Sequence, residues 1–438
     1  MSQSQGIKLI LRAFRHRNYR LFFGGQAVSL IGTWMQQIAL GWLVYRLTDS
    51  AFLLGVVGFA TQVPTFLLAT FAGVYADKYN NHKIIITTQT FAMIQAFILA
   101  YLTLSHQVTV WYIILLSIFA GIINAFDMPT RQSFVIEMVE DKNDLPNAIA
   151  LNSSMFNSAR LIGPTAAGFL ISSVGEGMCF LLNAVSYIAV IAALFAMKIK
   201  KKEKTQAKKK VLTELKEGIK YSYNFKPIRA ILLMIAVVSL AGMPYTILMP
   251  VIAKDVLHGN ANTLGFLMAA VGIGAMAGAI YLASRKTVIG LGRWIYYASG
   301  IFGISLILFS FSRTIPLSIF LMLFTGFGMM VQMASCNTVL QTIVDDDKRG
   351  RVMSLYVTAF MGSAPFGSLV AGSLASNIGT PATLLLSGIT ILIVAVVFAR
   401  VIPSLRVLIR PVYVEKGIIP EVSKGLQATT HLQMPPED

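Results

Sequence analysis

A permanent cation lies within an apolar stretch in the segment SARLIGPTAAG, residues 158–168, where Arg160 precedes the pair Gly163-Pro164. Arginine keeps its charge at any physiological pH. Arg160 therefore has either a role in binding or gating, or a structural role in an ion pair. On a helix at 100° per residue, one third of the circumference would hold a polar stripe together with the helix breaker. The members of this stripe are Ser153, Asn157, Arg160, Pro164 and Gly168.

Three other segments carry polar side chains at helical spacing. They are Gln26, Ser29, Thr33, Gln36 and Gln37; Thr325, Gln332 and Ser335; and Ser117, Gly121 and Asn124. Such stripes either line a polar cavity or hold helices together through hydrogen bonds. Met and aromatic residues accompany them, and flexible thioethers suit varied apolar ligands as well as ordinary packing. These residues include Trp34, Met243, Tyr245, Met329 and Met333.

Residue types used in enzymatic chemistry are scattered. The five histidines form no cluster, and Cys179 and Cys336 stand far apart with no metal-ligand spacing. The chain also has no nucleotide-binding P-loop. The sequence therefore predicts no enzyme, no metal site and no cofactor.

The composition indicates a membrane protein. The 438 residues are 55% hydrophobic and 13% charged, and the mean hydropathy is +0.69. About 20 apolar residues span a bilayer as a helix, and runs of that length exclude barrel strands. The predicted fold class is an all-α polytopic membrane protein with twelve transmembrane helices. We expect spans at 21–45, 52–75, 84–104, 109–126, 147–174, 178–197, 228–252, 262–284, 294–312, 315–341, 352–376 and 382–402.

The positive charges are distributed asymmetrically. Odd-numbered connections carry only Arg46, Lys254 and Arg313, whereas the termini and even-numbered connections carry thirty basic residues. This asymmetry predicts that both termini are cytoplasmic, and that the net charge of +17 does not indicate nucleic-acid binding. The first span is too long for a cleaved signal peptide. We expect it to remain as the first helix.

The hydrophobic sequence divides into two halves. Residues 198–226 hold eleven Lys and three Glu and separate six spans from six. An offset of 204 pairs residues 147–170 with 351–374, including Gly163 with Gly367 and Gly168 with Gly372. We therefore expect a basic N-terminus (1–20), a six-helix bundle (21–197), a basic linker (198–227), a second six-helix bundle (228–402) and an extended or disordered cytoplasmic tail (403–438). Repeated halves with a site between them are typical of secondary transporters.

Five segments carry a resemblance to the major facilitator superfamily, over roughly residues 10–402. They are FRHRNYRLFFGGQAVSLIGTWMQQIALGWLVYRLT, GVYADKYNNHK, DMPTRQSFVIEMV, LPNAIALNSSMFNSARLIGPTAAGFL and RGRVMSLYVTAFMGSAPFGSLVAG. The chain is similar to the subgroup that contains the bacterial enterobactin exporter and related drug and siderophore exporters. The resemblance implies two pseudo-symmetric six-helix bundles, with the first, fourth, seventh and tenth helices around a central cavity. Its candidate substrate and cavity residues are Gln26, Thr33, Gln36, Asn124, Asn157, Arg160 and Gln332.

Three motifs within this resemblance suggest gating. GVYADKYNNHK resembles a loop latch with Gly73, Asp77, Lys78 and Lys83, although Asn80 replaces the glycine of its turn. In DMPTRQ, Asp127 and Arg131 form either a local pair or a contact to the other half, where Asp346, Arg349 and Arg351 are possible partners. GPTAAG resembles an antiporter motif. Its helix-packing residues would be Gly163, Pro164 and Gly168.

The expected function is export of a small amphipathic molecule, a siderophore or drug-like compound, by alternating access. The resemblance implies exchange for protons. The residues themselves identify no carboxylate relay, because none of the 19 acidic residues lies in the middle of a predicted span. A lysophospholipid flippase of the same fold and a non-transporting receptor or scaffold are the alternatives. The expected partners are the small-molecule substrate and membrane lipid, and we expect a monomer.

Overall fold

A computed structural model describes residues 11–199, 211–285 and 287–419, and the regular elements in these ranges are helices. The first half contains η1 (Arg12–Arg15), α2 (Arg17–Thr48), α3 (Ala51–Lys78), α4 (Asn81–Leu104), α5 (Val110–Met138), η2 (Lys142–Asp144), α6 (Leu145–Val174) and α7 (Glu176–Phe195). The second contains α8 (Val211–Asn224), α9 (Lys226–Gly242), α10 (Tyr245–Val251), η3 (Ile252–Val256), α11 (Ala261–Ala283), α12 (Leu291–Phe311), α13 (Ile315–Ile343), α14 (Arg349–Ile378) and α15 (Thr380–Glu415).

The twelve predicted spans all correspond to long helical segments. Eleven of these segments in the described ranges are long and apolar enough to cross a membrane. The remaining one, α6, has 30 residues but does not reach the same apolar composition. Its polar stripe around Arg160 lowers the hydropathy, and its position between other helices supplies the protein contacts that such a helix needs.

Local sequence explains where several helices begin. The Asn80 side chain accepts a hydrogen bond from the backbone N–H of Lys83 at 3.2 Å and caps α4. Ser50 caps α3 in the same way, and Asn260 forms a capping box with Thr263 at the start of α11. Such side chains satisfy backbone donors that have no partner within the helix. Asn80 therefore has a local structural role at the position where the latch motif has glycine.

The internal repeat is present in the structure at the predicted offset. Helices α6 and α14 both contain 30 residues and begin and end 204 positions apart. Each is followed by a glycine with φ of +85°, Gly175 and Gly379, and then directly by the next helix. Glycine adopts this positive φ without the steric cost of a Cβ atom. The same short turn has thus been kept in both halves.

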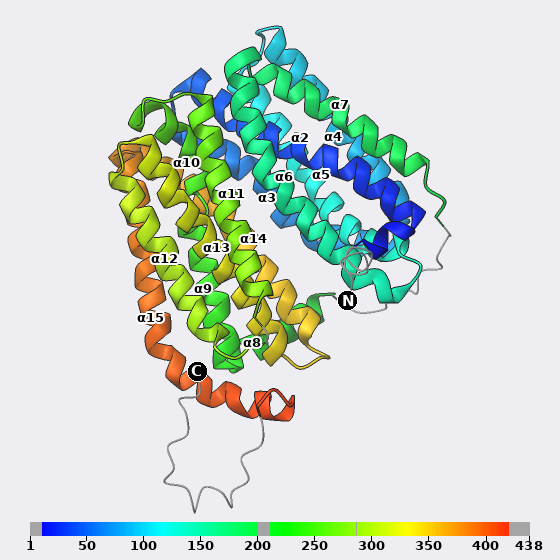
Figure 1. The fold of residues 1–438 in the computed structure, drawn as a ribbon, viewed down its shortest axis with the longest axis vertical. Helices are drawn as coiled ribbons and strands as arrows, with labels where there is room; N and C mark the ends of the chain where they lie inside the picture. Colours follow the sequence, from blue (N-terminus) through cyan, green and yellow to red (C-terminus); the bar gives the residue numbers. More distant parts are fainter. Residues whose placement is uncertain (1–10, 200–210, 286, 420–438) are drawn as a thin grey trace, which may run out of the picture.

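The spanning helices form two bundles, shown in blue to green and in green to red in Figure 1. The N bundle contains α2–α7 and the C bundle contains α9–α15. Between them, α3 packs against α14 and α6 against α11. We call the end of the bundles that holds η1 and α8 the terminal end, and the opposite end the far end. In Figure 1 the bundles diverge towards the terminal end.

The apolar core shows the same asymmetry. One buried cluster runs through the C bundle and includes Leu43, Val44 and Leu54 of the N bundle, all near the far end. A second cluster contains Phe22, Phe134 and other N-bundle residues near the terminal end. The two bundles therefore share a core at the far end, whereas the N bundle has its own core at the terminal end.

Three segments differ from the sequence expectation. The seventh span is interrupted between α9 and α10 because Pro244 has no backbone N–H for the helical ladder, and it ends in the π-helical turn η3. The expected linker contains α8, whose Glu217 pairs with Arg351 at 2.9 Å. The last helix continues past residue 402, through Pro403, to Glu415. The extended tail expected from residue 403 is therefore helical for its first part.

Candidate functional site

Arg160 lies where the two bundles meet. Its guanidinium carbon is 5.7 Å from the ring centre of Trp34 on α2, and its Nη2 atom is 3.9 Å from the sulfur of Met329 on α13. The Tyr245 hydroxyl lies 4.0 Å from the same sulfur. A cation, two aromatic rings and a thioether therefore meet at one point, with contributions from both bundles.

Close helix packing positions this cation. A Cβ atom on Gly163 would lie 2.5 Å from Cβ of Trp34, so glycine allows α6 to reach α2. On the other flank, a Cβ on Gly272 of α11 would lie 3.2 Å from Cα of Leu161. At 100° per residue, Arg160 falls between these two packed flanks. Its side chain is thereby directed at the boundary between the bundles and away from lipid.

Gln36 and Thr33, two members of the predicted polar stripe on α2, have different kinds of hydrogen-bond partner. Gln36 donates to Gln95 on α4 at 3.1 Å and accepts from Asn183 on α7 at 2.7 Å. Thr33 donates to the Ser29 carbonyl at 2.9 Å. Gln36 therefore forms interhelical hydrogen bonds, which is the second of the two interpretations given for such polar stripes. No observation in this conformation supports a role for Gln36 in binding the substrate.

Gln36→Leu is expected to weaken the N bundle without changing substrate selectivity. Interhelical hydrogen bonds in membranes contribute about 0.6 kcal/mol on average, so losing two should lower the free energy of unfolding by about 1 kcal/mol. Thermal unfolding in detergent measures this change. Gln37→Leu on the exposed side of α2 is the control. A large loss of transport with unchanged unfolding would instead assign Gln36 to the substrate site.

The remaining predicted cavity residues differ in burial and in their hydrogen-bond partners. Gln26 and Gln332 are buried, and the Oε1 atom of each has no hydrogen-bond partner within the described structure. Asn124 is exposed on α5, and Asn157 donates to the Ser153 carbonyl at 2.9 Å. Asn157 lies one turn from Arg160 on α6. It is therefore the predicted residue nearest in sequence to the cation.

The latch motif is spread along the surface at the end of α3. A Cβ on Gly73 would meet no atom within 4 Å, so the close approach expected there is absent in this conformation. Lys78 lies 5.5 Å from the Tyr79 ring centre, and Lys83 is exposed. The side chain of Asp77 lies outside the described part of the structure. The latch stays a prediction.

Asp127 and Arg131 form an ion pair within α5 in which Asp127 is buried and Arg131 is half-buried. Asp127 also accepts from the Thr88 hydroxyl at 2.8 Å and from Gln89 Nε2 at 2.9 Å, both on α4. The candidate partners on the other half are engaged elsewhere, since Arg349 pairs with Asp346 and Arg351 with Glu217. In this conformation the local pair is present, and the gating contact is not formed among the described residues.

The packing motif takes part in a symmetric contact. A Cβ on Gly168 would lie 3.2 Å from Cα of Gly265, and a Cβ on Gly372 would lie 2.8 Å from Cα of Gly55. The first crossing joins α6 to α11 and the second joins α14 to α3. Gly55 and Gly265 were missed in the sequence, although they occupy the fifth position of α3 and of α11. The glycines allow backbone-to-backbone contact between bundles near the far end.

A polar clamp joins the bundles at the far end. The Tyr45 hydroxyl donates to Asp255, and Lys254 pairs with Asp49 at 2.6 Å. The Lys254 ammonium also lies 5.2 Å from the Tyr45 ring centre. Sequence analysis missed this clamp. The available signal was Lys254, one of only three basic residues on odd-numbered connections.

Tyr45→Phe is expected to loosen the clamp. Removing a hydrogen bond to a charged group should weaken closure by about 1.5 kcal/mol, which is about a tenfold shift in the open-to-closed ratio. Distances between spin labels at Leu47→Cys and Leu317→Cys, both exposed near the far end, measure the shift. Lys254→Gln should have a smaller effect because its partner Asp49 is exposed. Equal populations in wild type and Tyr45→Phe would show that the clamp does not hold the bundles closed.

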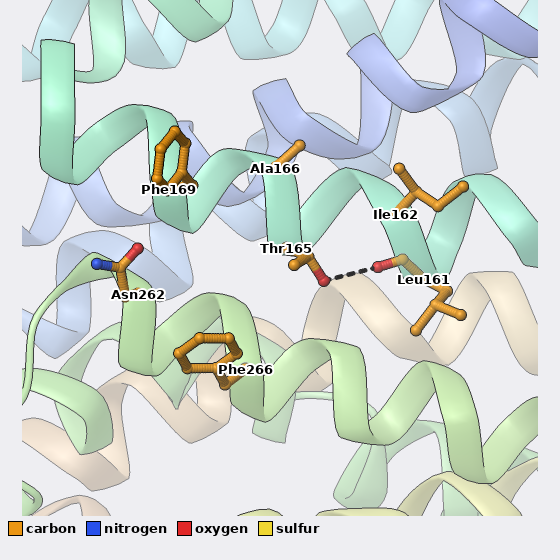
Figure 2. Close-up of a pocket in the computed structure, with 7 residues that line it drawn as sticks. All are labelled: Leu161, Ile162, Thr165, Ala166, Phe169, Asn262 and Phe266. Carbon is orange, nitrogen blue, oxygen red and sulfur yellow. Dashed lines mark hydrogen bonds between the residues drawn. The ribbon is translucent and has the colours of Figure 1, made fainter.

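An apolar groove lies on the opposite side of α6. It has a volume of about 600 Å³ and is lined by Leu161, Ile162, Thr165, Ala166, Phe169, Asn262 and Phe266. Figure 2 shows these side chains on α6 and α11, with Thr165 donating to the Leu161 carbonyl. Phe169 and Phe266 are exposed, as expected for a lipid-facing surface. None of its lining residues belongs to the predicted cavity set.

Charged groups at the terminal end pair within their own half. Arg15 contacts Asp141 at 2.5 Å and Asp144 at 2.6 Å. The backbone N–H of Asn143, with Arg15, holds the pKa of Asp141 below its ordinary value. Lys348 does the same to the pKa of Asp345. Both carboxylates are therefore ionised at neutral pH and poorly suited to carry a proton.

The described ranges contain no cluster of side chains that could bind a metal ion. No three His, Cys, Asp or Glu side chains come close enough there to hold a metal ion. Both cysteines are buried and unpaired. The site's chemistry is therefore that of a cation beside aromatic and thioether groups.

Two six-helix bundles that pack through paired glycines define a transporter of the major facilitator type. The family model described as transmembrane secretion effector matches residues 10–407, and the chain belongs to this family. The predicted superfamily and the multi-pass membrane character are thereby confirmed. The family consists of transporters, which confirms that the chain is not an enzyme.

Curated relatives cover most of the chain. The staphyloferrin A transporter of Staphylococcus aureus is 27% identical over 380 residues, 86% of this chain and 95% of the relative. The multidrug efflux pump Tap of Mycolicibacterium fortuitum is 23% identical, over 84% and 91% of the two chains. Macrolide efflux protein A of Streptococcus pyogenes is 24% identical, over 87% and 96%.

Solved structures support the fold. The nucleoside transporter NupG superposes with a TM-score of 0.67 at 14% identity, covering 90% of this chain and 98% of its own. An inward-facing, occupied bacterial homologue of the human lysosomal transporter Spinster gives 0.67 at 13% identity, covering 87% and 96%. At these identities the similarity concerns the fold alone.

Proposed function

We propose that the protein exports a small amphipathic molecule across the bacterial inner membrane by alternating access, in exchange for protons. The observation that carries this proposal is the pair of mid-membrane contacts that Arg160 makes, one with Trp34 and one with Met329 of the other bundle. Glycine crossings and a polar clamp close the far end, while the bundles diverge at the terminal end. Such a site can face one side of the membrane at a time.

The proposed orientation follows from the charges. Basic residues concentrate at the terminal end, so the positive-inside rule makes this end cytoplasmic. We propose that the conformation described here faces the cytoplasm, because the bundles diverge towards this end. The names of the siderophore transporter and of the drug and macrolide efflux relatives support small-molecule transport. We propose a monomer in lipid that uses the proton gradient and no cofactor.

Substrate-dependent proton flux in proteoliposomes tests the proposal. The purified chain is reconstituted with an internal pH indicator, and a macrolide, staphyloferrin A and a lysophospholipid are added in turn. An exporter should move protons when a macrolide or the siderophore is present. Flux only with the lysophospholipid would favour the flippase, and binding without flux would favour a receptor. Arg400→Gln, which changes an exposed arginine of α15, should transport as the wild type does.

A further inference from the structure

We propose that the substrate is an organic anion, with a carboxylate or similar acid group bound by Arg160 and an apolar or aromatic part beside Trp34. This inference rests on the proposed export function and adds the chemical class of the cargo. It distinguishes the chain from a pump for organic cations, which would need a carboxylate in the same place.

The depth of Arg160 makes its partners important. It stands 15 residues from the start of α6 and 14 from the end, which at 1.5 Å per residue is about 22 Å from either end. Arg160 is half-buried at this depth. A charge in this region costs at least several kcal/mol unless it is paired or hydrated.

The contacts of Arg160 do not neutralise its charge. The Met329 thioether is a weak acceptor at 3.9 Å, and the Trp34 ring at 5.7 Å supplies only a cation–π attraction. No carboxylate lies within 4.0 Å of Arg160 among the described side chains. Most of the five guanidinium N–H donors of Arg160 therefore have no acceptor among the described side chains and could bind an acid group of a ligand.

The acidic residues of the surrounding helices are occupied elsewhere. Asp127 pairs with Arg131, Glu176 with Arg46 at 2.7 Å, and Asp255 accepts from Tyr45. None of these pairs includes Arg160. The centre of the molecule therefore carries an uncompensated positive charge, which repels organic cations and attracts anions.

Aromatic side chains next to the cation favour an amphipathic anion. The ring centres of Trp34 and Phe156 are 5.7 Å apart in an edge-to-face arrangement. Phe156 is one helical turn from Arg160 and is 46% exposed. Gly163 lets α6 approach Trp34 closely, since a Cβ at this position would lie 2.5 Å from Cβ of Trp34. An acid group on Arg160 would thus place an adjoining apolar part against exposed aromatic surface.

A matched set of fluorescent probes tests whether the bound molecule is an anion. Dansylglycine is an anion, dansylglycinamide is neutral and dansylcadaverine is a cation, while all three share one aromatic group. Binding is measured by dansyl fluorescence with the full chain in nanodiscs of zwitterionic lipid, after subtraction of empty nanodiscs. Wild type, Arg160→Lys, Arg160→Gln and the control Arg400→Gln are compared, and the thermal unfolding midpoint of each is recorded.

We expect wild type and Arg400→Gln to bind dansylglycine at least about tenfold more tightly than the other two probes. Arg160→Gln should remove this preference, and Arg160→Lys should keep part of it because the charge remains but the bidentate fork is lost. A wild-type preference for the cation or the neutral probe would overturn the inference, and this comparison needs no variant. A preference that persists in a folded Arg160→Gln protein would also overturn it.

Transport of the same probes separates the two proposals. If wild-type proteoliposomes move only dansylcadaverine, the exporter proposal stands and the anion inference fails. If dansylglycine binds through Arg160 but neither it nor the other probes are moved, the anion inference stands and the exporter proposal fails.

Discussion

Gly168→Val is expected to open the far end of the protein. A Cβ at this position would lie 2.8 Å from the Ala261 carbonyl oxygen and 3.1 Å from Cα of Asn262. Both are backbone atoms and cannot move aside as a flexible side chain could. Overpacking of this kind costs about 1–3 kcal/mol, which corresponds to a shift of about fivefold to more than a hundredfold towards the conformation open at the far end.

The symmetric variant should act in the same direction. A Cβ on Gly372 would lie 2.9 Å from the Ala51 carbonyl oxygen, so Gly372→Val separates α14 from α3. Spin labels at Leu47→Cys and Leu317→Cys report the far end, and labels at Lys83→Cys and Ser284→Cys report the terminal end. The double variant should lengthen the first distance and shorten the second.

The control for both variants is Gly24→Val on α2, where an added Cβ meets no atom within 4 Å. It should leave both distances unchanged. If Gly168→Val and Gly372→Val also leave both distances unchanged while the protein stays folded, the glycine crossings do not determine which end is closed.

Arg131→Met is expected to be among the most destabilising single changes in the N bundle. It leaves Asp127 buried without its cation, with only Thr88 and Gln89 as hydrogen-bond donors. Removing one partner of a buried pair costs about 3–5 kcal/mol because the remaining charge is uncompensated. The unfolding free energy in detergent, measured by denaturant titration, should fall by that amount.

The double variant Asp127→Leu with Arg131→Met distinguishes an uncompensated charge from lost packing. It should recover most of the stability, since both charges are replaced by apolar groups. Arg349→Met is the control, because its partner Asp346 is exposed, and it should cost no more than about 1 kcal/mol. A double variant as unstable as Arg131→Met would show that the charge of Asp127 is not the cause.

Hydrophobic periodicity predicted most of the fold. The twelve spans and the offset of 204 follow from apolar runs and from identities such as Gly168 with Gly372, and both are present in the structure. The interruption at Pro244 was not predicted because the surrounding sequence is uniformly apolar. Helix α8 was missed because its lysines and glutamates resemble a solvated linker.

The site was less predictable than the fold. Helical spacing places a side chain on a face but does not identify which neighbour that face meets. Gln36 and Gln26 share one stripe on α2, yet Gln36 is held by α4 and α7. The Tyr45 to Asp255 contact joins residues 210 positions apart, and no local pattern marks it. Arg160 was identifiable because a charge in an apolar run is conspicuous without tertiary information.

The central claim is that the surroundings of Arg160 open to one side of the membrane at a time. A single cysteine at Asn157, one turn from Arg160, tests it when Cys179 and Cys336 are replaced by alanine. Membrane-impermeant thiol reagents are applied from each side. The account predicts labelling from the terminal end in the otherwise unchanged protein, and from the far end when Gly168→Val and Gly372→Val are added. Labelling from both sides at once, or from the same side in both proteins, would contradict it.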